Sequence, residues 1–402
     1  MITMERMLDG LPHKAQNRIY GVVDNLRTMA GVGNVKVAAS MAPSVMRGLI
    51  LGKGRVGDSV PMPASHAAHY DLTYQGEFPD MYDLYRRAVA NQWDGERDLD
   101  WSTGVDLENP ATAVMPLDYP PFEGLAAKGI KLNAKEKLRF ANDLASWTLS
   151  QFMHGEQGAL YAAAQVTESV KWLDGKFYGA TQVMDEGRHL EVFLRYLDTK
   201  MQKVYAVNDN LFVILDDLLT DSRWDVKFLG MQIMVEGLAL GAFGTMYNFT
   251  KEPLLKQLLK YVIQDEARHV HYGVLALREH IGRELSDAEK REREDWAFEV
   301  ALLMRNRFLS HELYYEWFEG QISLKEWDEV VMSAPSMAAF RHLMFLRLIP
   351  NLEYIGLMSD RIKGHYDKAG LTSFLGGKNA TQLSGDDLIR DISAYRMPAA
   401  TR

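Results

Sequence analysis

The chain has 402 residues, of which 47% are hydrophobic and 25% charged, a composition that excludes disordered and collagen-like proteins. Its formal net charge of −9 would repel a phosphate backbone, so we expect no nucleic-acid partner. The chain contains no cysteine, which excludes disulfides, thiolate nucleophiles and iron–sulfur clusters and leaves Glu, Asp and His as metal ligands.

The N-terminal part of the chain is rich in proline. Nine of the thirteen prolines lie in the first 121 residues, which predicts short helices, such as one over 81–93, separated by loops. We expect residues 1–130 to wrap over the rest of the protein. Residues 1–10 carry charges where a secretory signal needs an apolar stretch, and this predicts a cytoplasmic location.

The middle of the chain favours long helices. No proline occurs between residues 122 and 252, and a proline inside a helix costs about 3 kcal/mol. Asn133 and Glu136 have the spacing of a capping box, which marks a helix start. Apolar residues at helical spacing predict four long helices: 133–170, 177–201, 222–249 and 252–281.

The third of these segments is apolar enough to suggest a membrane span over 228–247. It carries Glu236 near its middle, however, and a carboxylate is costly at bilayer depth. The segment therefore predicts a helix buried in protein, with no membrane span.

Further helices are predicted towards the C-terminus. Ser286 and Glu289 form a second capping-box pattern, which opens a helix that we expect to run to Trp317. Two more helices are predicted over 324–332 and 337–358, the latter bent at Pro350. The chain, 1–402, is interpreted as a single domain, with a core over 131–282 and packed C-terminal helices over 283–402.

One five-residue pattern occurs twice. Asp-Glu-x-Arg-His stands at 185–189 and again at 265–269. Positions i and i+3 share one helix face, so Glu186 with His189, and Glu266 with His269, can each converge on a metal ion. A single Glu-x-x-His pattern arises about once by chance in a chain of this composition, but two copies in one frame do not.

Two further acids lie at matching distances from this repeat. Glu156 stands 30 residues before Glu186, and Glu236 stands 30 residues before Glu266, each in a mostly apolar helix. A buried carboxylate needs a charged or hydrogen-bonding partner. Four carboxylates and two neutral imidazoles would balance two divalent cations, and we predict a dinuclear metal site whose ligands are also the catalytic residues: Glu156, Glu186, His189, Glu236, Glu266 and His269.

The remaining charged residues of the repeat suit a supporting role. A metal-bound histidine usually donates its other N–H to a carboxylate, so Asp185 and Asp265 are predicted to bond the histidine of the opposite motif. Arg188 and Arg268 would then neutralise these aspartates. The alternative is that the four residues form ordinary ion pairs along their helices.

At these residues the sequence resembles the dinuclear-iron carboxylate proteins of the ferritin-like superfamily, in particular the branch of the ribonucleotide reductase small subunits and the bacterial diiron oxygenases. The resemblance covers about residues 133–282. It implies an all-α fold, a ferritin-like four-helix bundle with additional N-terminal and C-terminal helices. It also implies two iron ions, with a Mn/Fe pair possible, that activate dioxygen, and a homodimer.

The sequence departs from several subfamilies of this superfamily. Phe193 stands where radical-generating reductase subunits generally carry a tyrosine. Leu240 stands where multicomponent hydroxylases usually have a threonine, and Val262 where arylamine oxygenases have a histidine. The metal cage is therefore better supported than any one subfamily.

The leading hypothesis is a dioxygen-activating diiron oxygenase, a monooxygenase-type oxidoreductase that acts on an apolar or aromatic substrate or an acyl chain. Electrons would come from a ferredoxin or reductase, because no flavin or nicotinamide motif is visible. The alternatives are a reductase-like ligand-binding oxidase or radical-generating subunit, and a non-catalytic iron-binding protein. Five residues are predicted to line the substrate pocket: Phe152, Phe193, Gly237, Leu240 and Phe243.

Overall fold

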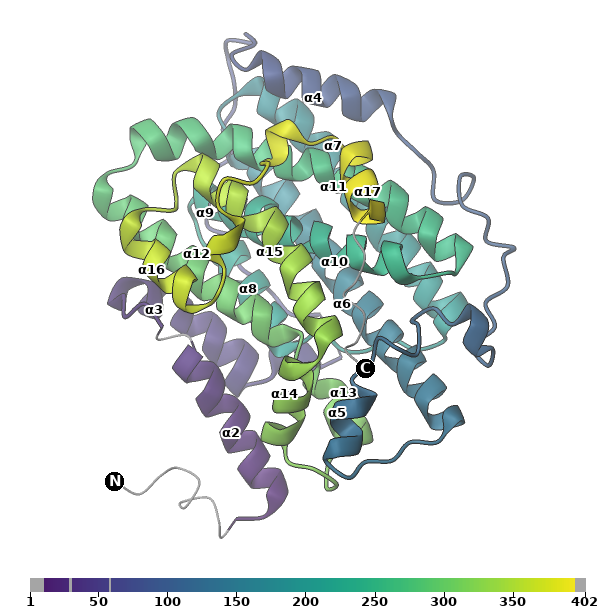
Figure 1. The fold of residues 1–402 in the computed structure, drawn as a ribbon. Helices are drawn as coiled ribbons and strands as arrows, with labels where there is room; N and C mark the ends of the chain where they lie inside the picture. The colour runs from purple at the N-terminus through teal and green to yellow at the C-terminus, as the bar shows by residue number, and fades with distance from the viewer. Residues whose placement is uncertain (1–10, 29–30, 58, 395–402) are drawn as a thin grey trace.

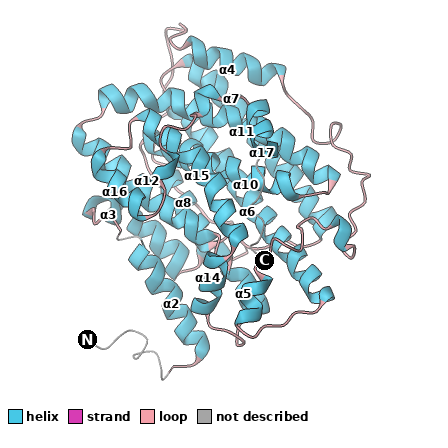
Figure 2. Ribbon diagram, viewed as in Figure 1, coloured by secondary structure: helices cyan, strands magenta, loops and turns pink. Residues whose placement is uncertain are grey.

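Helices form nearly all the regular structure of the computed structural model, which describes residues 11–28, 31–57 and 59–394 (Figures 1 and 2). No β-strand occurs in these ranges, where the only β pairing is an isolated bridge between Glu319 and Ile322. The predicted all-α fold class is confirmed. The localisation argument drawn from residues 1–10 concerns a segment outside the described residues.

Four helical rods form the centre of the molecule. They are α6 (Ala134–Ser169), α7 (Leu173–Tyr196), the rod that ends in α10 (Glu236–Phe249), and α11 (Pro253–Glu279). Helix α6 packs along α7, α10 packs along α11, and α7 also contacts α11. These contacts connect all four rods into one bundle.

Local signals explain where these helices begin. The Asn133 side chain accepts from the Glu136 backbone N–H at 2.9 Å, and the Glu136 carboxylate accepts from the Asn133 N–H at 2.7 Å, so the predicted capping box is confirmed. Helix α11 begins with Pro253, which has no N–H to leave unpaired. The Glu252 carboxylate caps it by accepting from Leu254 and Leu255 at 2.9 and 2.7 Å.

The third rod changes helical geometry along its length. It starts as α9 (Trp224–Phe228), continues through a π-helical stretch over Leu229–Val235, and becomes α10 at Glu236. The 26 residues from Trp224 to Phe249 form the one helix in the described ranges that could cross a membrane by length and composition, and 94% of its most apolar window is buried inside the protein. This finding agrees with the predicted buried helix.

Two expectations about helix boundaries were wrong. The helix predicted from Ser286 to Trp317 is two helices, α12 (Asp287–Arg307) and α13 (His311–Trp317). Ser310 has φ 47° between them, and the Leu309 carbonyl accepts from the Trp327 indole at 2.6 Å, so the helical ladder stops there. The second long helix begins at Leu173, four residues before its predicted start.

The outer helices cover the bundle on several sides. Helix α15 packs on α10, α4 packs on α7 and α11, α17 packs on α11 and α10, and α8 lies between α6 and α12. Helix α4 corresponds to the helix predicted over 81–93, whereas α2, α3, α5 and α8 were not delimited from the sequence. The bounds of these outer helices are as follows: α2 (His13–Thr28), α3 (Val35–Val45), α4 (Pro79–Ala90), α5 (Phe122–Ala127), α8 (Asp209–Thr220), α14 (Leu324–Ser333), α15 (Pro335–Ile355), α16 (Asp360–Lys368) and α17 (Gly385–Ala394).

Candidate metal centre

The six residues proposed as ligands meet at the centre of the bundle. Glu156 comes from α6, Glu186 and His189 come from α7, and the other three come from α10 and α11. Each of the six is at most 4% exposed to solvent. Their ligand atoms form two groups with separations of at most 4.8 Å: Glu156, Glu186, His189 and Glu266 in one group, and Glu186, Glu236 and His269 in the other.

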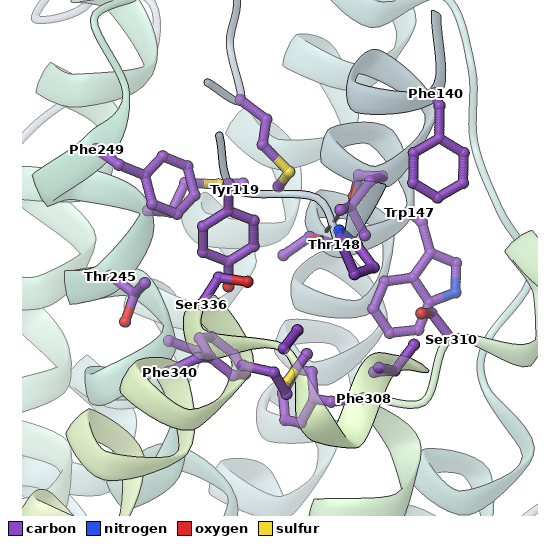
Figure 3. Close-up of a pocket in the computed structure, with 18 of the residues that line it drawn as sticks. Tyr119, Phe140, Trp147, Thr148, Thr245, Phe249, Phe308, Ser310, Ser336 and Phe340 are labelled. Carbon is purple, nitrogen blue, oxygen red and sulfur yellow. Dashed lines mark hydrogen bonds between the residues drawn. The ribbon is translucent and has the colours of Figure 1, made fainter. Parts of the chain in front are cut away.

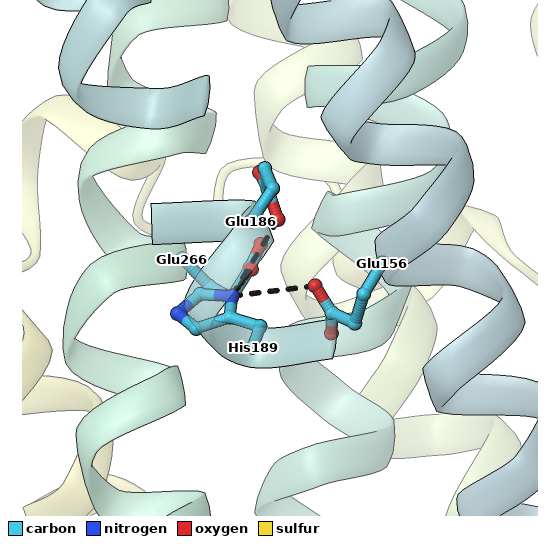
Figure 4. A group of neighbouring side chains, drawn as sticks. All are labelled: Glu156, Glu186, His189 and Glu266. Atoms are coloured by element: carbon cyan, nitrogen blue, oxygen red, sulfur yellow. Dashed lines mark hydrogen bonds and ion pairs between the residues drawn. The ribbon is translucent and has the colours of Figure 1, made fainter. Parts of the chain in front are cut away.

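The Nδ1 atom of His189 faces three carboxylates (Figure 4). It lies 3.3 Å from Glu156 Oε2, 3.5 Å from Glu186 Oε2 and 3.2 Å from Glu266 Oε1. One imidazole nitrogen and three carboxylates form a donor set typical of iron or manganese.

The second histidine, His269, also faces carboxylates through its Nδ1 atom. His269 Nδ1 lies 3.1 Å from Glu186 Oε1 and 3.4 Å from Glu266 Oε1. The two imidazole rings are 5.9 Å apart. Glu186 and Glu266 therefore approach both histidines, as carboxylates shared between two ions must.

The other ring nitrogen of each histidine bonds an aspartate of the opposite motif. His189 Nε2 lies 3.1 Å from Asp265 Oδ2, and His269 Nε2 lies 3.3 Å from Asp185 Oδ2. An aspartate at Nε2 favours the proton on that nitrogen, so Nδ1 would be the atom available to a metal ion.

Two arginines form ion pairs with these aspartates. Arg188 bonds Asp185 on its own helix and also reaches Asp265 at 3.0 Å. Arg268 bonds Asp265 and lies 4.0 Å from Asp185. The four residues thus form a cross-linked group between α7 and α11 rather than two separate ion pairs along single helices.

Sequence reasoning missed several residues that bond this group. The Trp93 indole, from the segment after α4, donates to Asp265 Oδ2 at 2.7 Å. The Gln182 amide donates to Glu186 Oε1 at 3.1 Å and to Glu236 Oε1 at 2.9 Å. Gln182 lies four residues before Glu186, so its helical register was a usable signal, whereas nothing in the sequence places Trp93 here.

Burial and mutual repulsion shift the pKa values of the cluster. Burial, and then the proximity of Glu266, raises the pKa of Glu156 and of Glu236 well above the usual value. Burial also opposes ionisation of Glu186, but His269 and His189 outweigh it and lower its pKa. Burial lowers the pKa of His189, but its bonds to Asp265 and Glu156 prevail and raise it. Glu156 and Glu236 therefore need positive partners to become ionised.

The cluster also passes a direct test of fit for metal ions. Several of its buried polar atoms have no hydrogen-bond partner, and such atoms are rare in native proteins. They are Glu186 Oε2, Glu236 Oε2, both oxygens of Glu266 and Nδ1 of His269. All are potential ligand atoms, and together with neutral imidazoles the four carboxylates match the charge of two divalent cations.

The residues predicted to line a substrate pocket lie around this cluster. Phe152, Phe193 and Phe243 pack against one another, with ring centroids 4.6 to 6.0 Å apart. Leu240 lines a small cavity next to α17. A methyl group on Gly237 would lie 3.9 Å from Leu348, an ordinary contact. The role of these five residues stays a prediction.

Comparison with known proteins gives structural neighbours but no sequence relative. No family model and no curated protein matches the chain. Solved structures of variants of an R2-like ligand-binding oxidase with a reconstituted Mn/Fe cofactor are similar, with TM-scores of 0.44, 0.45 and 0.46 at 19%, 17% and 18% identity. Each match covers 70% of this chain and 95% of the other.

Proposed function

We propose that the protein is a dinuclear-metal oxidase or oxygenase that uses dioxygen to oxidise an apolar or aromatic substrate. The observation that carries the proposal is the cluster of four glutamates and two histidines, with its unpartnered ligand atoms in a dry core. Two iron ions, or a Mn/Fe pair, held by these residues would supply the redox chemistry that protein side chains lack.

The side chains around the cluster have distinct tasks in this proposal. Asp185 and Asp265 hold the Nε2 protons of the two histidines, while Arg188 bonds both aspartates and Arg268 bonds Asp265. Gln182 orients Glu236 by donating to one of its oxygens. The surrounding apolar rings exclude water, which strengthens every electrostatic contact inside.

An apolar pocket, part of it open to solvent, supports the choice of substrate class (Figure 3). Its walls come from α6, α10, α14, α15, the segment before α5 and the turn between α12 and α13, and include Tyr119, Trp147, Phe308 and Phe340. No Asp, Glu, Lys or Arg lies among the described residues that line it. Such a lining favours an apolar or aromatic compound, or an acyl chain, over a charged one.

Two aromatic residues lie along α6 and α10 between residues that line this cavity and residues of the cluster. Thr148 lines the cavity eight residues before Glu156 on α6, a rise of about 12 Å. Phe152 lies halfway along that stretch and packs edge-on against Phe243 of α10 with ring centroids 4.6 Å apart. In this proposal the two rings must move to admit a substrate from the cavity to the metals.

Oxygen uptake under defined loading tests the proposal. The protein is loaded anaerobically with ferrous iron, freed of unbound metal, and mixed with oxygen, an external reductant and a panel of apolar and aromatic compounds. Oxygen uptake that depends on the compound, together with an oxidised product, would support an oxygenase. Iron binding with no compound-dependent uptake would refute it, and many irons per chain would indicate storage instead.

A further inference from the structure

A solvent-exposed cavity lies away from the metal cluster, on the outer side of α12 and α15. It encloses about 960 Å³, part of it open to solvent, between α12, the end of α14, the first half of α15 and the turn after α16. None of the cluster residues lines it, and it shares no lining residue with the apolar cavity described above.

The cations at this cavity lack a carboxylate in its wall. Arg305, Arg341 and His342 line it, and the described lining residues include no Asp or Glu. The Arg305 guanidinium donates to the neutral Asn306 side chain at 3.2 and 3.1 Å, and Asp24 of α2, outside the lining, attracts it at longer range. The Arg341 guanidinium donates to the Met332 carbonyl at 3.1 Å.

The positive charges of the two arginines also repel each other. Burial lowers the pKa of both side chains, and the proximity of Arg305 lowers the pKa of Arg341 further. Elsewhere in the molecule Arg361 illustrates the usual solution, because it bonds both Glu294 and Asp295. Two partly desolvated cations side by side favour an anion from outside the chain.

The floor of the cavity is apolar and largely aromatic. Phe298, Phe345 and Phe374 are buried beneath it, and the His342 ring packs edge-on against Phe374 with centroids 4.9 Å apart. A small inorganic anion would satisfy the arginines but leave this surface uncovered. A ligand with an anionic head and an apolar body would satisfy both parts.

We infer that this cavity is a second binding site, separate from the metal centre, for an organic anion that carries a carboxylate or phosphate on an apolar or aromatic body. The two guanidiniums bind the anionic head, and the phenylalanine floor contacts the body. The inference does not depend on the oxidation chemistry proposed for the cluster.

Calorimetric titration of the full-length chain tests this site. The probes are naphthyl phosphate and naphthoate, which distinguish the two head groups, and the neutral naphthylmethanol. We expect at least one anionic probe to bind, and the Arg305→Gln/Arg341→Gln double variant to weaken that binding about tenfold or more. Binding of naphthylmethanol should be the same in both proteins. Arg283→Gln, an exposed arginine paired with Glu279, is the matched control and should bind as the parent does.

Two results would overturn the inference: no binding of either anionic probe by the parent protein, or equal binding by the parent and the double variant. Because the arginines repel each other, the double variant should melt no lower than the parent, and a large fall in its melting temperature would mean that they serve the fold instead. Ala338→Phe gives a second route, since it fills the cavity from its exposed side and keeps both arginines. It should also weaken the anionic probes.

Discussion

Each histidine of the cluster uses both ring nitrogens, one towards the carboxylates and one towards an aspartate of the opposite motif. Of the two aspartates, Asp265 accepts more hydrogen bonds. It accepts from Trp93, Arg188, Arg268 and His189, so one carboxylate joins α7, α11 and the segment after α4. Both the ligand geometry and the local packing therefore depend on its charge.

Substituting Asp265→Asn should weaken metal binding about 10- to 100-fold, because the neutral amide no longer fixes the Nε2 proton of His189 and removes one charged partner from each of two arginines. Competitive titration with a coloured chelator measures the loss. Asp360→Asn, at a fully exposed aspartate paired with Lys363, is the control and should change nothing. Equal affinities in the Asp265 variant and the parent would exclude this role.

The aromatic pair between cavity and cluster makes a prediction about substrate size. Phe152→Leu should shorten the barrier and raise the oxygen uptake supported by bulky aromatic compounds relative to small ones, at a stability cost of about 1–2 kcal/mol. Phe249→Leu, on the Tyr119 side of the cavity, enlarges the cavity without touching the barrier. If both variants shift the size profile alike, Phe152 is no barrier.

At the scale of elements, the contact between α10 and α15 depends on one glycine. A Cβ on Gly241 would stand 2.5 Å from the Leu343 carbonyl oxygen and 2.5 Å from Met344 Cα, both backbone atoms that cannot turn aside. The backbone of α15 therefore occupies the space where a side chain at position 241 would lie.

Gly241→Ala should therefore destabilise the protein by about 1–3 kcal/mol, since α15 must shift to admit a methyl group. Gly237→Ala, one turn earlier on the same helix, meets only Leu348 at 3.9 Å and should leave stability unchanged or raise it by about 0.5–1 kcal/mol. Chemical denaturation measures the free energy of unfolding of the two variants. Equal stabilities would contradict the close packing at Gly241.

Helix α12 carries a pH-sensitive contact. Burial raises the pKa of Glu299 to about 7, against a usual value near 4.5, although the carboxylate accepts from the Val32 N–H at 3.0 Å. Between these two values the folded protein holds a proton that the unfolded chain has released. The contribution of Glu299 to stability is therefore lost as pH rises through this window.

In Glu299→Gln this loss should vanish, so the variant should gain about 2 kcal/mol on the parent between pH 5 and pH 8. Urea denaturation at several pH values measures the difference. A constant gap between the two proteins across this range would show that Glu299 does not titrate there.

At the scale of the whole molecule, helical periodicity predicted most of the central bundle. The four rods, the capping box of α6 and the buried apolar rod were predictable because caps and 3.6-residue spacing are local signals. The six proposed ligands could be chosen because charged residues recur in an apolar register at equal intervals. These signals need no knowledge of the partner helix.

Features that depend on distant contacts were not predictable in this way. The stop at Ser310 follows from a bond between the Leu309 carbonyl and Trp327, and the place of Trp93 at Asp265 follows from a loop that returns to the bundle. The Arg305 and Arg341 cavity joins residues of α12 and α15 whose sequence spacing has no pattern. Tertiary packing decides such features, and one sequence does not reveal it.

Metal analysis after anaerobic loading tests the central claim most directly. The parent protein should retain two ions per chain, and Glu266→Ala, which removes the carboxylate that approaches both histidines, should retain one or none while staying folded. Glu279→Ala, at an exposed position of the same helix, should retain two. A parent protein that retains no metal, or a Glu266 variant that binds as much as the parent, would contradict the account.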